Sequence, residues 1–245
     1  MNLLSLDINI LLGVILASIL QSIFGVGVLL FGTPILLICG YSFPDILSIL
    51  LPISMGISLS QIIKDHRLID MSFIRGICIY TLPFIILFLF IALNSGKNLS
   101  PFIALLLFLF AVKNFYAPLN KVINTITRFE KTWLIVTGII HGLTNLGGSL
   151  LSIIVQQKNY PKDTARVTIA AAYILFALFQ LMTLISSSEQ ARITLVHNLG
   201  YVGIGVLVYL LANELLYKCI SHQNYAKAFS AFLFFSGLLV VYKSL

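Results

Sequence analysis

The chain has 245 residues, of which 59% are hydrophobic and only 9% are charged. Soluble globular proteins carry about 25% charged residues, so this composition excludes a chain with a fully solvated surface and indicates a polytopic membrane protein. The net charge of +7 does not indicate nucleic-acid binding, because the Lys and Arg residues fall in short connections between apolar runs, where membrane topology uses them. The three cysteines are scattered and predict no disulfide framework.

The first apolar run covers residues 8–44 without a charge and is interrupted by the stretch QSIFGVGVLLFGTPIL (residues 21–36). A membrane helix needs about 20 apolar residues, so this run is too long for one straight span and too short for two spans with a loop. We expect a single broken or tilted helix over residues 8–39. Further spans are expected over residues 46–63, 71–93 and 99–116.

The second half repeats this plan. Residues 132–157 contain no Asp, Glu, Lys or Arg and are interrupted by HGLTNLGGS (residues 141–149), and spans over 167–188, 193–213 and 225–242 follow. We predict an all-α polytopic membrane protein with eight transmembrane helices in two repeats of four, the first helix of each repeat broken at a Gly-containing motif. The repeats cover residues 1–120 and 132–245, and a basic connecting loop over 121–131 separates them.

The repeat is also visible in single residues. At an offset of 120, Gln21 aligns with His141 and Gly27 with Gly147, while YSFPDILS (41–48) parallels NYPKDTAR (159–166). Eight full crossings would make the repeats parallel, whereas one re-entrant segment in each half would make them inverted, and the long first segments leave both arrangements open.

The distribution of basic residues gives an orientation in the cell (inner) membrane. If all eight segments cross, the side of the N-terminus holds more Lys and Arg residues than the other side, Lys64, Arg67 and Arg75 among them. Basic loops stay in the cytoplasm, so this count places both termini there.

Pairs of interrupted hydrophobic segments in matching positions point to the binding site of a transporter. The half-helix after each break offers N–H groups and the positive end of its dipole to an anion, and glycine lets the backbone approach a ligand closely. Polar side chains also share single helix faces, as Arg166, Tyr173 and Gln180 do on the sixth span. We expect the substrate to be bound by Gln21, Ser22, Gly25, Gly27, His141, Thr144, Asn145, Gly147, Gly148 and Ser149.

Each of these residues also has a purely structural interpretation. Small and hydroxyl residues at helical spacing serve close packing between membrane helices. His141, the one histidine well inside a predicted span, either couples transport to protons or hydrogen-bonds its surroundings while neutral. Arg166 either supplies the counter-charge for an anion or extends to the membrane interface.

The two motifs, FGVGVLLFGTPIL (residues 24–36) and TNLGGSLLSII (residues 144–154), are each followed by a proline-containing turn and a further helix. In this pattern the chain resembles the TauE/SafE family of membrane transporters. The resemblance implies export or uptake of sulfite, sulfonates and related organosulfur anions. We therefore expect a secondary transporter for a small anionic sulfur-containing solute, surrounded by the lipid bilayer and working without a cofactor.

Other classes of function are less compatible with the sequence. It contains no Walker-type nucleotide motif, no HExxH or GxSxG, and no pair of carboxylates within a span, so we expect neither an enzyme nor a metal site. The alternatives are a non-transporting integral membrane subunit and a channel for another small solute. The sequence leaves the oligomeric state open, and a homo-oligomer is compatible with it.

Overall fold

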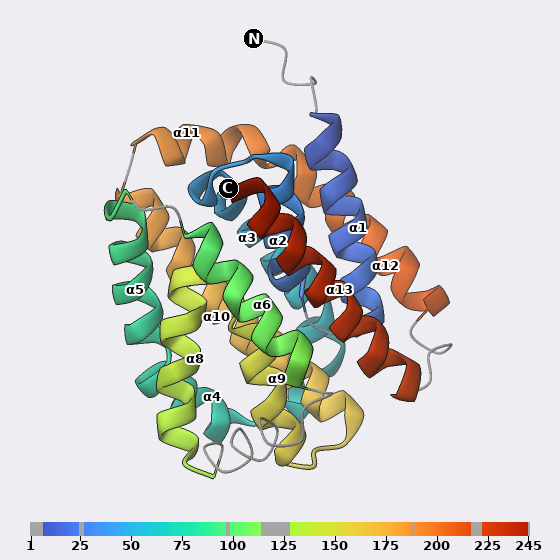
Figure 1. The fold of residues 1–245 in the computed structure, drawn as a ribbon. Helices are drawn as coiled ribbons and strands as arrows, with labels where there is room; N and C mark the ends of the chain where they lie inside the picture. The colour runs from blue at the N-terminus through green and yellow to red at the C-terminus, as the bar shows by residue number, and fades with distance from the viewer. Residues whose placement is uncertain are drawn as a thin grey trace.

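The computed structural model describes residues 7–24, 27–96, 99–113, 128–187, 189–216 and 222–244, and within these ranges it contains helices and no strand (Figure 1). The elements are α1 (Ile8–Phe24), α2 (Val28–Cys39), α3 (Phe43–Asp65), the 3₁₀ turn η1 (His66–Leu68), α4 (Met71–Tyr80), α5 (Leu82–Asn94), α6 (Ser100–Lys113), α8 (Glu130–Thr144), α9 (Gly148–Gln157), α10 (Lys162–Ser187), α11 (Glu189–Asn198), α12 (Gly200–Leu216) and α13 (His222–Ser244). The predicted site residue Gly25 and most of the connecting loop 121–131 lie outside the described residues.

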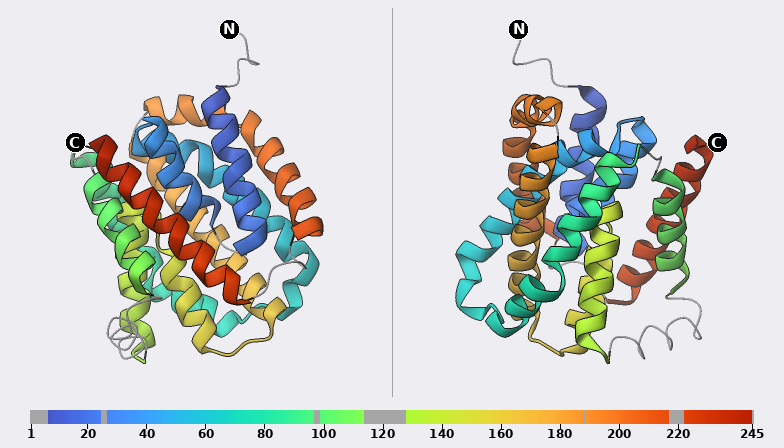
Figure 2. Two further views of the ribbon diagram at one scale, coloured as in Figure 1. Left: turned by 45° about the vertical axis from the view of Figure 1, so that its right-hand side comes forward. Right: turned by 90° about the vertical axis from the view of Figure 1, so that its left-hand side faces the viewer.

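The first long apolar segment forms a helical hairpin. α1 and α2 pack antiparallel: a Cβ on Gly13 would lie 2.9 Å from the side chain of Leu36, and one on Gly32 would lie 3.4 Å from the Cβ of Ala17. α2 begins after Gly27, whose φ of 123° favours glycine, and it runs back alongside α1. The expectation of a single broken helix is therefore wrong in its path, because the chain turns back at the break instead of continuing across (Figure 2).

The second long segment forms a hairpin of the same kind. At its open end Lys158 Nζ lies 3.0 Å from Glu130 Oε2, and further along the Trp133 indole N–H donates to the carbonyl of Leu150 at 2.9 Å. At its tip α8 ends at Asn145 in the left-handed conformation, with φ 65°. The α1–α2 hairpin opens toward the end of the molecule where α1 begins, and the α8–α9 hairpin opens toward the opposite end (Figures 1 and 2).

Among the described residues, three stretches are long and apolar enough, by length and composition, to span a membrane: Phe43–Leu68, Met71–Asn94 and Lys162–Ser187. The first and third are 61% and 56% buried inside the molecule, against 33% for the second, so α3 and α10 form its centre. The second stretch bends at Thr81, between α4 and α5. Pro83 lies in the first turn of α5, where it has no backbone N–H to continue the hydrogen bonding of α4.

The helices pack in two matching sets. α1 contacts α2 and α12, and α8 contacts α9 and α5. α3 packs on α2 and α12, and α10 packs on α9 and α5. Finally, α3 packs on α10 and α6 packs on α13. These contacts match if α1 corresponds to α8, α2 to α9, α3 to α10, α5 to α12 and α6 to α13. Each contact in one half then has its counterpart in the other half.

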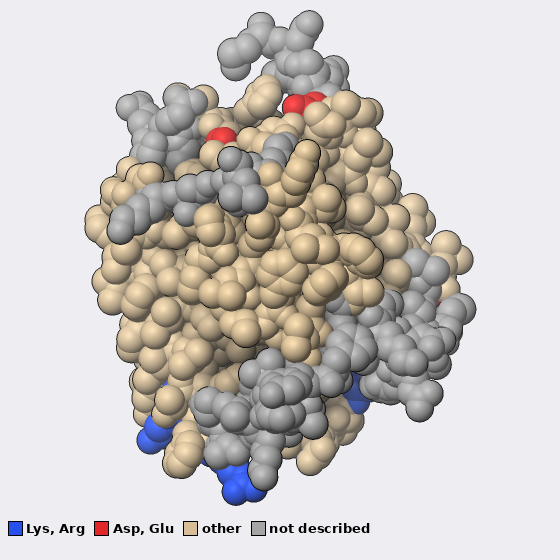
Figure 3. Space-filling view, viewed as in Figure 1, with Lys and Arg blue, Asp and Glu red and all other residues tan. Residues whose placement is uncertain are grey.

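The described basic side chains gather at one end of the molecule. They lie at the end of α3, in η1 and α4, just before and at the start of α8, in the α9–α10 connection and at the start of α10 (Lys64, Arg67, Arg75, Arg128, Lys131, Lys158, Lys162 and Arg166). On the face drawn in Figure 3, Lys and Arg lie at the lower end, and the Asp and Glu residues visible there lie near the start of α1. The expectation that Lys64, Arg67 and Arg75 share the side of the N-terminus is therefore wrong, because the α1–α2 hairpin returns the chain to its starting side before α3 crosses.

Candidate functional site

At the tip of the first hairpin the predicted polar site residues bond to the backbone. Gln21 Oε1 accepts a hydrogen bond from the backbone N–H of Val28, so this buried side chain caps the start of α2. Ser22 Oγ donates to the carbonyl of Ile19 at 2.7 Å within α1. Gly27 immediately precedes α2, and a Cβ on it would come 2.8 Å from the ring of Phe31.

Two predicted site residues of the second hairpin are likewise engaged locally. Thr144 Oγ1 donates to the carbonyl of Ile140 at 2.6 Å and accepts from the backbone N–H of Leu146 at 3.2 Å. Ser149 Oγ donates to the carbonyl of Leu146 at 3.0 Å. Both hydroxyls stabilise the turn between α8 and α9, as side-chain caps do at helix ends.

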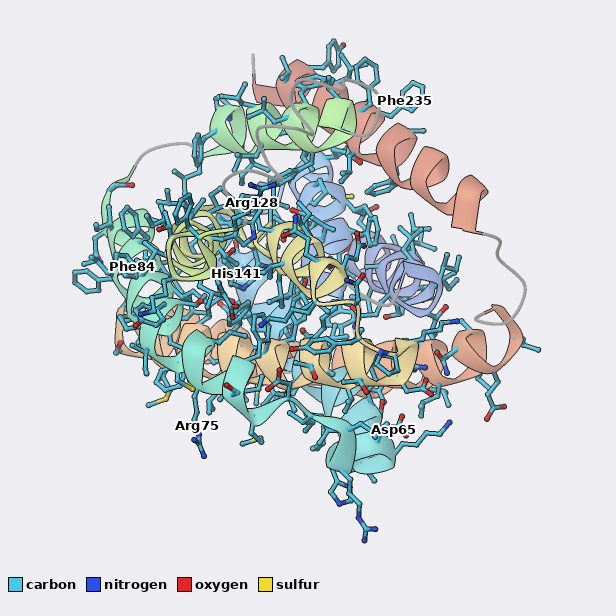
Figure 4. All side chains as sticks on the ribbon, turned by 90° about the horizontal axis from the view of Figure 1, so that it is seen from below. Asp65, Arg75, Phe84, Arg128, His141 and Phe235 are labelled. Atoms are coloured by element: carbon cyan, nitrogen blue, oxygen red, sulfur yellow. The ribbon has the colours of Figure 1, made fainter. Side chains whose placement is uncertain are left out.

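His141 lies in the interior of the bundle, whereas the labelled residues Asp65, Arg75 and Phe84 lie at its periphery (Figure 4). Its side chain is 0% exposed, and its Nε2 lies 3.1 Å from Oε1 of Gln180 on α10. Among the residues that the structure describes, its Nδ1 has no hydrogen-bond partner.

The two glycines that open α9 lie against buried polar side chains. A Cβ on Gly147 would meet the Cβ of His141 at 2.5 Å and its Nδ1 at 3.0 Å. A Cβ on Gly148 would lie 1.5 Å from the hydroxyl oxygen of Tyr173. That hydroxyl is buried and has no partner in the described part of the chain. Only glycine lets these side chains come so close to the first turn of α9.

Asn145 joins the tip of the second hairpin to the first hairpin. Its Nδ2 donates to Thr33 Oγ1 on α2 at 3.2 Å, and its side chain is 0% exposed. Its Oδ1 is buried without a partner among the described residues, as is Nε2 of Gln180.

We call the four side chains with these unpaired atoms, His141, Asn145, Tyr173 and Gln180, the tip cluster. A buried polar atom without a partner costs about 1–3 kcal/mol, so a group of four such atoms is unusual in a folded interior. His141 and Tyr173 lie against the two glycines at the start of α9, Asn145 precedes these glycines in the chain, and Gln180 contacts His141. At a helix start the first N–H groups have no partner within the helix and the dipole is positive. No Asp or Glu belongs to the tip cluster, so the arrangement suits an anion.

The tip cluster is not a metal site of the usual kind. In the described ranges, no group of three or more His, Cys, Asp or Glu side chains lies close enough to hold a metal ion. The side chains that converge carry amide, phenol and imidazole groups, which hydrogen-bond to oxyanions.

Arg166 lies on α10 two helical turns from Tyr173. Its Nη2 donates to the hydroxyl of Tyr209 at 2.6 Å and to Oδ1 of Asn213 at 3.0 Å, and the same hydroxyl accepts from Nε2 of Gln61 at 2.6 Å. Seven residues of α-helix rise about 10 Å, so Arg166 does not contact the tip cluster.

Three residues of the site were missing from the expected set. Tyr173 and Gln180 follow Arg166 at seven-residue intervals on one face of α10, a pattern present in the sequence, but nothing in it shows that this face meets the second break. Thr33 reaches Asn145 across a sequence separation of 112 residues, and no local pattern signals it.

A family model described as sulfite exporter TauE/SafE matches residues 10–240. The chain belongs to the TauE/SafE family. The match covers both hairpins and nearly the whole chain, so the family assignment and the apolar helices identify this TauE/SafE protein as an integral membrane protein and support its action as a membrane transporter. No curated protein and no solved structure matches the chain.

Proposed function

We propose that this TauE/SafE protein is a secondary transporter that moves a small sulfur-containing oxyanion, such as sulfite or a sulfonate, and binds it at the tip cluster. The observation that carries the proposal is a set of four buried polar atoms that have no partner among the described residues, two of them on side chains that lie against the glycines at the start of α9. An oxyanion there would accept hydrogen bonds from Tyr173, from Gln180 and from the first N–H groups of α9.

His141 gives this site a means of coupling to protons. The unpaired Nδ1 lies beside the helix N-terminus, with Gln180, Tyr173 and Phe176 as its ring neighbours and no carboxylate among them. An anion bound next to it favours the imidazolium form, because an opposite charge at close range stabilises the charged state. We infer that His141 takes up a proton together with the anion, so that the pair moves with no net charge.

The two hairpins supply a framework for alternating access. They open toward opposite ends and pack against matching partners, which supports an inverted repeat with one re-entrant hairpin and three crossings in each half. The hydrogen bond from Asn145, a member of the tip cluster, to Thr33 links the second hairpin to the first. Movement of one hairpin relative to the other would expose the site to one side at a time.

The charge distribution supports an orientation in the cell membrane. Basic connections face the cytoplasm, so the end that carries Lys64, Arg75 and Lys131 belongs there. Both termini then face the opposite side, the reverse of the orientation expected from eight crossings. On this orientation Arg166 lies on the cytoplasmic approach to the tip cluster, and we assign it a role in attracting the anion rather than in holding it. A reporter enzyme fused to the C-terminus that is active only outside the cytoplasm would support this orientation, and one active only inside would refute it.

The experiment that tests the function is uptake into liposomes that contain the purified protein. Labelled sulfite, sulfate, taurine, acetate and chloride are supplied outside, with and without an inwardly directed proton gradient. We expect saturable uptake of a sulfur oxyanion that the gradient accelerates, and we expect His141→Gln to lose the acceleration.

The matched control for that experiment is Ser152→Ala. Ser152 lies on α9, and its hydroxyl donates to the carbonyl of Gly148 at 2.9 Å, so the change removes a polar group near the site without touching the tip cluster. Its uptake should match that of the unaltered protein. Absence of uptake for every anion, in protein that remains folded, would refute the proposed function.

A further inference from the structure

We propose that the tip cluster selects anions that carry a hydrogen-bond donor of their own, a conclusion that rests on the proposed function and names its substrate class more narrowly. The class contains singly charged sulfur oxyanions with one O–H or N–H group, such as hydrogensulfite or an aminosulfonate. Oxyanions without such a hydrogen, sulfate among them, fall outside it.

The orientation of the Asn145 amide carries this inference. Thr33 Oγ1 donates its proton to the carbonyl of Leu29 at 2.7 Å, so toward Asn145 this oxygen can only accept. The group 3.2 Å from it must therefore be the amide nitrogen, Nδ2. The remaining atom, Oδ1, is buried without a partner in the described residues and can only accept a hydrogen bond.

The neighbouring pair of His141 and Gln180 does not change the need of Asn145 Oδ1 for a hydrogen-bond donor. If the imidazole Nε2–H donates to Gln180 Oε1, then Nδ1 is left as an acceptor and the amide nitrogen as a donor; the opposite tautomer and amide orientation exchange these roles. Protonation of His141 turns the pair into donors alone. Asn145 Oδ1 remains an acceptor in every case.

A ligand at the tip cluster therefore meets one fixed acceptor among donors. An oxyanion without hydrogen would place oxygen lone pairs against Oδ1 and leave it buried and unpaired. A site with an unmatched buried polar group rejects such a ligand more strongly than an apolar pocket would. An anion with one O–H or N–H group satisfies Oδ1 and uses its other oxygens for Tyr173, Gln180 and the start of α9.

The test compares sulfamate with methanesulfonate, two singly charged anions that differ in an amino group against a methyl group. Their binding to the purified full-length protein is measured by calorimetry. We expect sulfamate to bind at least tenfold more tightly. A second pair, isethionate and ethanesulfonate, differs in one hydroxyl and tells whether an O–H donor serves as well as an N–H donor.

Three variants locate the source of the preference. Asn145→Gly removes the amide at a φ of 65° that glycine adopts without strain, so this variant should fold. We expect the ratio of its dissociation constants for methanesulfonate and sulfamate to fall to about one. Thr33→Val removes the acceptor that orients the amide and should also weaken the preference. Thr33→Ser keeps the hydroxyl and should retain it.

The outcomes separate this inference from the proposed function. Equal binding of sulfamate and methanesulfonate would overturn the selectivity and leave the anion site standing. A preference that survives in Asn145→Gly would overturn the assignment to Asn145. Failure of all four anions and of hydrogensulfite to bind would overturn the proposed function and this inference together.

Discussion

The hydroxyl of Tyr173 lies directly over Gly148, so close that a Cβ on the glycine would be 1.5 Å from the phenolic oxygen. The contact brings a buried hydroxyl, which has no partner in the part of the chain that the structure describes, from the centre of α10 to the first turn of α9. It joins the second hairpin to a central helix at the point where the chain reverses, and it makes the glycine at this position a requirement of packing.

Gly148→Ala should displace Tyr173 or the start of α9, and we expect anion uptake to fall at least tenfold because the tip cluster loses its geometry. Uptake by liposomes that contain equal amounts of folded protein is the measurement. Gly203→Ala on α12 is the control, since its Cβ would meet nothing within 4 Å. Normal uptake by the Gly148 variant would show that the contact does not shape the site.

Tyr173→Phe should weaken anion binding while leaving the unliganded protein as stable as before or more stable. A hydrogen bond to a charged group is worth about 1.5–3 kcal/mol, so the dissociation constant should rise tenfold or more. The unliganded protein loses only a buried hydroxyl that has no partner in the described residues. Calorimetry and thermal unfolding without ligand measure the two effects. A fall in stability with unchanged binding would assign the hydroxyl a structural role instead.

Two glycines of α8 allow the second hairpin to lie against the backbone of the α4–α5 stretch. A Cβ on Gly138 would lie 2.5 Å from the carbonyl oxygen of Thr81, and one on Gly142 would lie 2.7 Å from that of Ile85. Small residues four positions apart are a common basis for close packing of membrane helices. We expect Gly138→Ala to lower the free energy of unfolding by about 1–3 kcal/mol, the usual cost of overpacking.

Denaturant unfolding in detergent measures the effect of the Gly138 change. Gly76→Ala is the control, because its Cβ would approach only the Leu134 side chain, at an ordinary 3.4 Å. Equal stability of the two variants would mean that α8 can shift away from α5 at no cost.

Acid stability should depend on Asp70 and Tyr160 at the basic end of the molecule. The Tyr160 hydroxyl donates to the Asp70 carboxylate, which holds the pKa of Asp70 below its ordinary 3.8. Because the folded pKa is lower than the unfolded one, this contribution to stability is present above about pH 3.8 and is lost as the pH falls through the folded pKa. Tyr160→Phe should therefore raise the pH at which acid unfolding begins.

The acid-unfolding experiment is followed by intrinsic fluorescence between pH 7 and pH 2. Tyr242→Phe, at a side chain that is 82% exposed, serves as the control and should leave the acid transition unchanged. An unchanged transition in Tyr160→Phe as well would show that the carboxylate gains nothing from this hydroxyl.

The sequence by itself determined the class of the protein and the positions of its breaks. Its composition predicts a helical membrane protein, and the interruptions at residues 21–36 and 141–149 coincide with the ends of α1 and α8, where the two hairpins turn back. Glycine and polar residues inside an apolar run indicate such turns, since irregular backbone in a bilayer must be buried in protein or line a polar site.

Only the tertiary structure decided where the chain goes after each break. A glycine interruption permits a helix to continue or to turn back, and the choice depends on contacts such as those of Gly13 with Leu36, which no local pattern encodes. The same holds for the tip cluster: helical periodicity places Tyr173 and Gln180 on one face of α10, but the packing of α10 against α9 brings that face to His141. Local spacing fixes a face of a helix, whereas the partner of that face is fixed by the burial of the whole bundle.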